Sequence, residues 1–317
     1  MEGSVTNLFS PGEEVLVING GKFGERWGKI AGAYGLKVRE LRVEWGQGAR
    51  VEDVRTLLDE HPAIRGVLVQ ASETSTAAVH PIEAIAQLTR QRDTLFIVDG
   101  ITAVGVFDIP MDRWGIDVLI TGSQKALMLP PGLAFLALSE RAWQRAKQAK
   151  LPRFYFDLAK ERDNLAKDTT AWTPAISLII GLREALAMIR EEGLPRVFAR
   201  HARMAAATRA AAAAMTLKLV APEAPSPALT GIYTPPDVDG GKLVAYLRDR
   251  MGVTFAGGQD QLKGKIVRIA HLGYMGVFDV VTAIAAFEMA LRHFKHDVPL
   301  GRGVGAAEDV LMAAMPE

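Results

Sequence analysis

One stretch of the sequence, residues 94–134, limits the possible folds more than any other part of the chain. It holds two short apolar runs, each followed by a polar side chain: residues 95–98 precede Asp99, and residues 118–120 precede a small polar segment and Lys125. Apolar runs of this length, bounded by Gly and Asp, are typical of buried strands in a parallel sheet. In open α/β sheets, ligands bind just beyond the carboxyl ends of such strands. The sequence therefore predicts that Asp99 and Lys125 lie at one sheet edge and face one crevice.

The residues that follow Lys125 are mostly apolar, Ala-Leu-Met-Leu-Pro-Pro-Gly. Apolar surroundings disfavour the ammonium form of a lysine, and its neutral, nucleophilic amine can then form a Schiff base. An acid nearby can keep a pyridinium nitrogen protonated, which is the partner that pyridoxal phosphate requires. The alternative is that Asp99 only caps a helix and that Lys125 is solvated, which would give the same spacing in the sequence. Spacing alone therefore does not decide between these two interpretations.

Three segments within and beside this stretch, VDGITAVG, MDRWGIDVLITGSQKAL and PPGLAFLALS, closely resemble the class V (fold-type I) aminotransferases. The resemblance runs over nearly the whole chain, and the nearest branch is the alanine–glyoxylate and serine–pyruvate aminotransferases. It implies that pyridoxal phosphate is the cofactor, that Asp99 pairs with its pyridine nitrogen and that Lys125 carries it. It also implies a small amino acid such as alanine or serine and a 2-oxo acid such as glyoxylate or pyruvate as substrates.

The same resemblance assigns three further residues to the cofactor. The segment Glu-Thr-Ser-Thr matches a loop whose first hydroxyl contacts the ring oxygen, which maps to Thr74. Phe23, in a GxxGxRW-like segment, matches the aromatic residue that stacks on the ring. Gln124, next to Lys125, is expected near the phosphate or the ring. For Thr74 the alternative is simple capping of the helix that follows, and for Phe23 it is a place in the core.

Arg268 stands inside an otherwise apolar strand, residues 266–270. A half-buried arginine needs an anionic partner, and its planar fork suits a carboxylate. The resemblance assigns it to the substrate carboxylate; the alternative is a structural salt bridge. Residues 169–175 resemble the segment that crosses to the partner subunit of a homodimer and helps to bind its phosphate. Thr170 and Thr173 are the candidates, although Trp172 stands where a small polar residue is expected, and a Thr-Pro helix start is the alternative.

The chain has 317 residues, enough for a large core and two domains. Strand–helix alternation predicts an α/β large domain at 1–193, with a mostly parallel sheet of the seven-stranded type in which the strand at 133–138 is antiparallel. A small α+β domain is expected at 194–317. Residues 151–171 are predicted to be irregular. Among the later elements we expect strands at 217–220, 230–234, 253–255 and 266–270 and a closing helix at 278–295.

Several classes of protein are excluded by composition. The chain has no cysteine, which excludes cysteine desulfurases and thiolate-bound nickel or iron–sulfur centres, and with them the hydrogenase function named for some relatives of this branch. The six histidines show no metal-binding spacing. A net charge of +1 gives no reason to expect nucleic acid. No signal peptide or membrane span is recognised, so we expect a cytoplasmic protein without membrane contact.

The start of the chain is abrupt, because residues 1–9 read as the middle or end of a helix. In the family a glycine- and hydroxyl-rich loop precedes this helix and holds the cofactor phosphate. We therefore expect a truncated chain or a start assigned at an internal methionine. This leaves two alternatives to the transaminase: a related cofactor-dependent enzyme with a phosphonate or ureido donor or a lyase reaction, and a weak or inactive family member.

Overall fold

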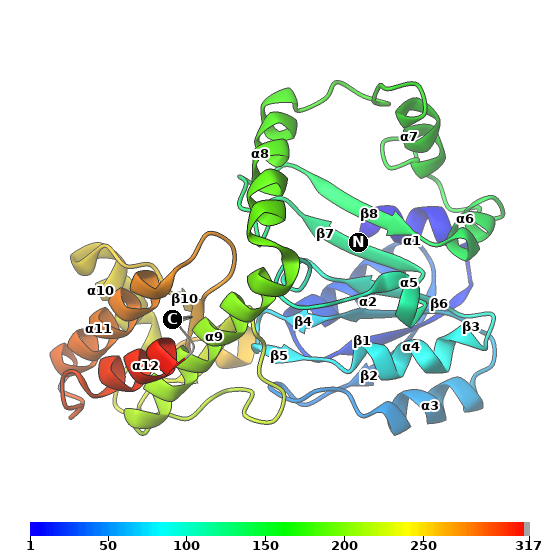
Figure 1. The fold of residues 1–317 in the computed structure, drawn as a ribbon. Helices are drawn as coiled ribbons and strands as arrows, with labels where there is room; N and C mark the ends of the chain where they lie inside the picture. The colour runs from blue at the N-terminus through cyan, green and yellow to red at the C-terminus, as the bar shows by residue number, and fades with distance from the viewer. Residues whose placement is uncertain (314–317) are drawn as a thin grey trace.

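The computed structural model describes residues 1–313, in which a large sheet between helices adjoins a smaller C-terminal unit (Figure 1). The large sheet has six strands in the order β2-β1-β3-β6-β7-β8. The first five strands are parallel, and β8 pairs antiparallel with β7, as the sequence predicts. Their bounds are β1 Glu14–Asn19, β2 Lys37–Arg42, β3 Ile64–Gln70, β6 Leu95–Asp99, β7 Val118–Gly122 and β8 Ala134–Leu138.

The central strands are apolar on both sides because helices cover both faces of the sheet. In β1, Val15 and Val17 face a cluster with α1, α2 and α6, while Leu16 and Ile18 face a cluster with α3, α4 and α5. The first group of helices is Glu2–Leu8, Lys22–Ala33 and Glu140–Ala146, and the second is Val51–Glu60, Ile82–Arg90 and Met111–Trp114. Burial on both faces leaves the strand ends as the places for polar groups.

The smaller unit is an antiparallel three-stranded sheet, β10-β11-β9, packed against four helices. Its strands are β9 Leu229–Tyr233, β10 Ala256–Gly257 and β11 Ile266–Ala270, and its helices are α9 Leu194–Ala214, α10 Gly240–Met251, α11 Val277–His293 and α12 Arg302–Ala313. A helix α8, Ile176–Glu192, connects the two parts and ends at Gly193, where φ is +83°. We propose Gly193 as the boundary between two domains.

The predicted fold class is confirmed, but the predicted number of strands in the large sheet is wrong. Within residues 1–313 the sheet has six strands, and β8 is an edge. Along the chain, β8 ends at Leu138 because the next residue, Ser139, caps α6, with its hydroxyl accepting the N–H of Ala142. Residues 151–171 are not entirely irregular either, since α7 (Leu158–Leu165) lies among them. Asp157 starts that helix by accepting the N–H groups of Ala159 and Lys160.

Three expectations for the smaller unit are also wrong. Residues 217–220 lie beside β9 but form only one bridge, Leu219 to Ile232, with two backbone hydrogen bonds, from Val220 N–H to Gly231 and from Tyr233 N–H to Lys218. The strand expected at 253–255 begins at Ala256, since the N–H of Val253 bonds back to the end of α10. Helix α12 follows the helix that was expected to close the unit. Its glycines are poor helix formers and conceal the apolar period of Val304, Ala307 and Leu311.

No helix among residues 1–313 is both long enough and apolar enough to cross a membrane.

The buried carboxylate of Asp117 ties β6, β7 and α6 together. It accepts the N–H of Phe96 at 2.8 Å, the hydroxyl of Ser139 at 2.8 Å and the guanidinium Nε of Arg141 at 2.8 Å. Removing one partner of a buried ion pair leaves the other charge uncompensated. We expect Asp117→Ala to lower the free energy of unfolding by about 3 kcal/mol, measured by chemical denaturation.

Asp108→Ala is the matched control, because the Asp108–Arg113 pair is exposed on both sides. Exposed ion pairs contribute less than about 1 kcal/mol. Equal losses in the two variants would contradict the role given to Asp117.

Candidate active site

The structure brings Asp99, Lys125 and Thr74 to the same edge of the large sheet. Asp99 ends β6, Lys125 follows β7, and Thr74 follows the short strand β4 (Ser72–Glu73) that comes after β3. The hydroxyls of Thr74 and Thr102 are 3.2 Å apart, and Thr102 lies just beyond Asp99. The carboxyl ends of neighbouring parallel strands meet at one edge, which is why residues distant in sequence converge here.

Asp99 is a buried carboxylate with few partners. Its Oδ1 accepts the N–H of Ile101 at 2.9 Å. Burial raises the pKa of Asp99, while the Ile101 N–H and the positive charges of the Met1 amino group and Arg26 oppose that rise. The carboxylate is therefore poorly solvated and gains from any positively charged hydrogen-bond donor that reaches it.

Lys125 lies in a loop that is closed by the buried side chain of Ser123. The Ser123 hydroxyl donates to the carbonyl of Pro130 at 2.7 Å and accepts the N–H of Leu133 at 3.1 Å. Lys125 itself is half-buried, and its carbonyl accepts the N–H of Met128 in a tight turn. Burial lowers the pKa of Lys125, and the positive charge of Arg268 lowers it further. A larger fraction of its amine is consequently neutral and able to act as a nucleophile or base.

Thr102 is a polar residue of this site that the sequence did not single out. Its hydroxyl donates to the carbonyl of Ser72 at 3.1 Å and lies 3.2 Å from the hydroxyl of Thr74. Thr102 thereby fixes the loop that carries Thr74 to the segment after Asp99. Its place, three residues beyond a strand-end aspartate, is the signal that could have identified it.

Phe23 lies in the first turn of α2 and is half-buried, outside the hydrophobic clusters of the core. The guanidinium carbon of Arg26 is 4.7 Å from the centre of the Phe23 ring, which is a cation–π contact. Arg26 also acts on the charge of Asp99. The sequence did not single out Arg26, although its spacing of three residues from Phe23 puts both on one helix face.

Arg268 is 9% exposed and lies on β11 of the smaller unit. Its Nε donates to the carbonyl of Gly257 at 3.0 Å and its Nη1 to the carbonyl of Thr74 at 2.7 Å. Burial lowers the pKa of Arg268, and the charge of Glu73 opposes this. Within residues 1–313 its Nη2 makes no hydrogen bond and no carboxylate pairs with it, which argues against the structural salt bridge.

The structure leaves the side chains of the other three predicted residues exposed. Gln124 is exposed, and its side-chain oxygen lies over Gly122. Thr170 and Thr173 are exposed in the loop between α7 and α8, at the end of α8 that is far from β4 and α2 (Figure 1). Trp172 occurs where a small polar residue was expected because its indole N–H donates to the carbonyl of Tyr155 at 3.0 Å and its ring packs on Tyr155.

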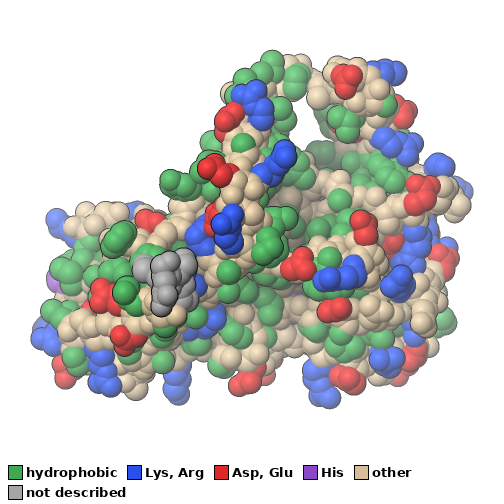
Figure 2. Space-filling model, in the orientation of Figure 1, with side chains coloured by type: hydrophobic (Ala, Val, Ile, Leu, Met, Phe, Trp, Pro, Cys, Tyr) green, Lys and Arg blue, Asp and Glu red, His purple; other side chains and the backbone are tan. Residues whose placement is uncertain are grey.

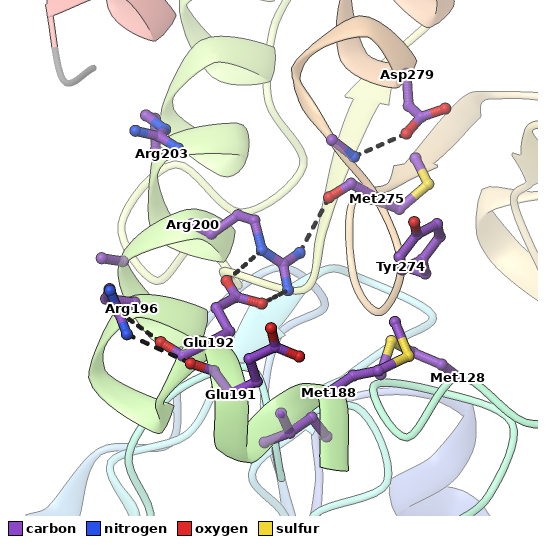
Figure 3. A pocket seen from close by; sticks show the side chains of 13 residues that line it. Met128, Met188, Glu191, Glu192, Arg196, Arg200, Arg203, Tyr274, Met275 and Asp279 are labelled. Carbon is purple, nitrogen blue, oxygen red and sulfur yellow. Dashed lines mark hydrogen bonds and ion pairs between the residues drawn. The ribbon is translucent and has the colours of Figure 1, made fainter. Parts of the chain in front are cut away.

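A pocket of about 880 Å³ opens beside the Lys125 loop, between α8, α9 and the turn after β11 (Figure 3). Met128 of that loop lines it together with Met188 and Tyr274, whereas Asp99, Thr74, Lys125 and Arg268 do not. Figure 3 shows Arg200 of α9 reaching across to Glu192 and to the turn. The arginine pairs with Glu192 at 2.6 Å.

Arg200 and His201 hold the turn after β11 against Lys125. Arg200 donates to the carbonyls of Gly273 and Met275, each at 3.0 Å, and His201 Nε2 accepts the N–H of Gly273 at 3.0 Å. Gly273 has φ +84°, and a Cβ there would lie 3.2 Å from the carbonyl oxygen of Lys125. This close approach requires a glycine at position 273. Through the turn after β11, α9 is thereby connected to the loop that carries Lys125.

Comparisons with known proteins agree with this geometry. Residues 2–272 match the family model described as aminotransferase class-V. The chain is 42% identical to the "Soluble hydrogenase, small subunit" of Synechococcus sp. over 99% of its length and 83% of the relative. It is 34% identical to the serine–glyoxylate aminotransferase of Arabidopsis thaliana over 99% of its length and 80% of the relative. The crystal structure of ureidoglycine–glyoxylate aminotransferase from Bacillus subtilis superposes with a TM-score of 0.94 at 31% identity, covering 98% of this chain and 81% of that one.

The buried side chain of His201 makes stability depend on pH. Burial and the charge of Arg200 lower its pKa from 6.5 to about 4, against the opposing effects of the Val197 carbonyl and Glu192. Between these two values the unfolded chain binds a proton and the folded chain does not. The stabilisation is thus complete above pH 6.5 and is lost as the pH falls toward 4.

In His201→Gln the amide oxygen can still accept the N–H of Gly273. The wild type loses stability between about pH 7 and pH 5, and we expect this loss of unfolding free energy to be smaller in the variant by about 1 to 2 kcal/mol. Urea denaturation at both pH values measures the difference. His80 and His271 are buried as well and titrate in both proteins, so only the difference between wild type and variant counts. An unchanged pH dependence would contradict this account.

Proposed function

Since this chain belongs to the class V aminotransferase family, we propose that it transfers the amino group of a small amino acid to a 2-oxo acid such as glyoxylate or pyruvate, with pyridoxal phosphate as its cofactor. The observation that carries the proposal is the convergence of Asp99, Lys125, Thr74 and Arg268 on one edge of the sheet, each with a pKa or a hydrogen-bond pattern that suits its role.

The residues of this edge fit pyridoxal phosphate. Asp99 is a buried carboxylate of raised pKa, and a protonated ring nitrogen is the cationic donor that would stabilise it. Lys125 has the lowered pKa that a cofactor-binding amine needs. Thr74 offers a hydroxyl to the ring oxygen, and the half-buried ring of Phe23 offers a stacking surface. Gln124 precedes Lys125 in the chain, and we assign it to the phosphate or the ring.

The reaction then divides among the side chains of the chain. When bound, the cofactor supplies a carbonyl that takes up the amino group and a ring that accepts the electrons of the substrate Cα–H bond. Arg268 holds the substrate carboxylate through its fork, which fixes the Cα–H bond in place. The neutral amine of Lys125 would remove the proton from Cα and deliver it to the cofactor carbon C4′ on the other side of the amino nitrogen, while Asp99 would hold the proton on the ring nitrogen.

The names of the relatives support glyoxylate as acceptor, because it occurs in both the Arabidopsis and the Bacillus names. The donors in those names differ, serine in one and ureidoglycine in the other. We favour a small donor of the alanine or serine class. The hydrogenase name of the Synechococcus relative is not carried over, because this chain has no cysteine to hold nickel or iron–sulfur clusters.

A homodimer would complete the site and account for Thr170 and Thr173. Helix α8 exposes Ile176, Ile179 and Ile180, with relative exposures of 64%, 47% and 52%. Figure 2 shows hydrophobic side chains along this projecting helix. An exposed apolar face of this kind marks an association surface. A second copy packed here would bring its own threonine loop toward the site of the first.

The test of the proposed chemistry is a visible spectrum with added pyridoxal phosphate. We expect an absorption band of the bound cofactor in the wild type and none in Lys125→Ala, because Lys125 is the lysine that, among residues 1–313, has a lowered pKa. Incubation with glyoxylate and alanine or serine should then yield glycine.

Lys147→Ala is the control, since Lys147 is an exposed residue at the end of α6. Loss of the band in both variants, or a band in neither the variants nor the wild type, would refute the assignment of Lys125. A band without glycine formation would refute the proposed acceptor.

The dimer is tested separately by light scattering after size-exclusion chromatography. We expect the wild type to have twice the chain mass of 34.3 kDa and Ile180→Asp to have the mass of one chain. A charge placed on an apolar interface is costly to bury. Met312→Asp, on an exposed position of α12, should remain dimeric. A monomeric wild type would refute the dimer.

A further inference from the structure

Glu73 is a fully buried carboxylate that none of the roles above uses. It lies in β4, directly before Thr74, and both of its oxygens accept hydrogen bonds. Oε1 accepts the hydroxyl of Ser75 at 2.6 Å and the N–H of Ser75 at 3.1 Å. Oε2 accepts the N–H groups of Phe23 at 3.1 Å and Gly24 at 3.0 Å.

These bonds satisfy the N-terminus of α2. A helix begins with N–H groups that have no partner within the helix, and the N-cap of α2 is Gly21, which has no side chain to supply one. The N–H of Lys22 donates to the Ser75 hydroxyl at 2.9 Å, and the next two N–H groups donate to Glu73. A negative charge at this end of a helix is also favoured by the helix dipole. The segment after β4 therefore caps α2 from outside.

The position requires a carboxylate and not an amide. Every hydrogen-bond partner of the Glu73 carboxylate is a donor, and each oxygen accepts at least one N–H, so a glutamine would turn its NH₂ group toward at least one N–H donor. There is also little room for a rearrangement. A Cβ at Gly21 would lie 2.6 Å from Glu73 Cγ and 2.4 Å from Ser75 Oγ.

Three binding residues from three segments depend on this carboxylate. Phe23 is bonded to it through its own N–H, and Thr74 is its neighbour in the chain. Arg268 donates to the carbonyl of Thr74 at 2.7 Å. The charge of Glu73 also acts on Arg268, whose pKa it raises against the effect of burial.

We propose that Glu73 is a positioning residue that sets Phe23, Thr74 and Arg268 relative to one another, so that ring stacking, the ring-oxygen contact and carboxylate binding occur in one geometry. It acts through these residues and does not itself touch cofactor or substrate. The inference rests on the proposed function, because it assigns Glu73 to the binding of that cofactor and that amino acid.

The chain offers a matched control in Glu288. This carboxylate is also buried, and it caps α12 by accepting the N–H groups of Gly301 at 2.7 Å, Gly303 at 2.5 Å and Val304 at 3.2 Å. It has the same chemistry at a helix N-terminus but belongs to the cluster around α9, α11 and α12, away from the edge of the large sheet. Glu288→Gln should destabilise the fold by the same mechanism and leave the binding residues in place.

The experiment compares the wild type, Glu73→Gln and Glu288→Gln by titration with pyridoxamine 5′-phosphate, which binds without a bond to Lys125. We expect Glu73→Gln to raise the dissociation constant by at least about tenfold, with a changed visible circular dichroism of the bound ring, and Glu288→Gln to stay within about twofold. The KM for the amino donor should rise in Glu73→Gln alone. Hydrogen exchange of peptides covering residues 22–27 and 72–76 should accelerate in Glu73→Gln without any ligand.

The outcomes separate the two proposals. Binding by the wild type with equal constants in Glu73→Gln would overturn the positioning role and leave the proposed function intact. Equal weakening in both variants would reduce Glu73 to a structural cap and also overturn the inference. Absence of binding by the wild type would overturn the proposed function and this inference with it. If Glu73→Gln does not fold, Ser75→Ala, which removes only the hydroxyl, replaces it, with an expected weakening of about threefold or more.

Discussion

The structure depends on a sheet whose central strands are buried on both faces. Such strands can hold polar groups only at their ends, because within the sheet each side chain meets a helix. Val15 and Val17 on one side of β1 and Leu16 and Ile18 on the other are examples of this restriction. The polar side chains of the candidate site accordingly lie at the carboxyl ends of the strands, where Asp99 is the last residue of β6 and Lys125 follows β7.

Burial also shifts the pKa values of these end groups. It raises the pKa of Asp99 and lowers the pKa values of Lys125 and Arg268, so that each is held in an environment that is unfavourable for its charge. Contacts with the surrounding backbone hold these side chains in place. Two backbone carbonyls accept hydrogen bonds from Arg268, and the hydroxyl of Ser123 closes the loop that carries Lys125. Groups with pKa values perturbed in this way are candidates for contact with a ligand.

Much of this arrangement could be predicted from the sequence, and the reasons differ from residue to residue. The strands of Asp99 and Lys125 have short apolar runs with clear ends, and Arg268 is conspicuous in an apolar strand. Thr102 and Arg26 stand at spacings that could have identified them, three residues after Asp99 and three after Phe23. Glu73 could not be predicted, because its role comes from tertiary contacts that no periodicity encodes. Helix α12 was missed because its glycines weaken the helical signal, and a carboxylate from α11 supplies the cap that its own sequence lacks.

The edge strand β8 has a consequence for the behaviour of the protein in a cell or a test tube. Within residues 1–313 it pairs only with β7, and its five residues, Ala-Phe-Leu-Ala-Leu, carry no charge. Nature usually protects such an edge with a lysine, a proline or a bulge, and none interrupts this one. The open side offers a template for backbone pairing to any extended segment that reaches it.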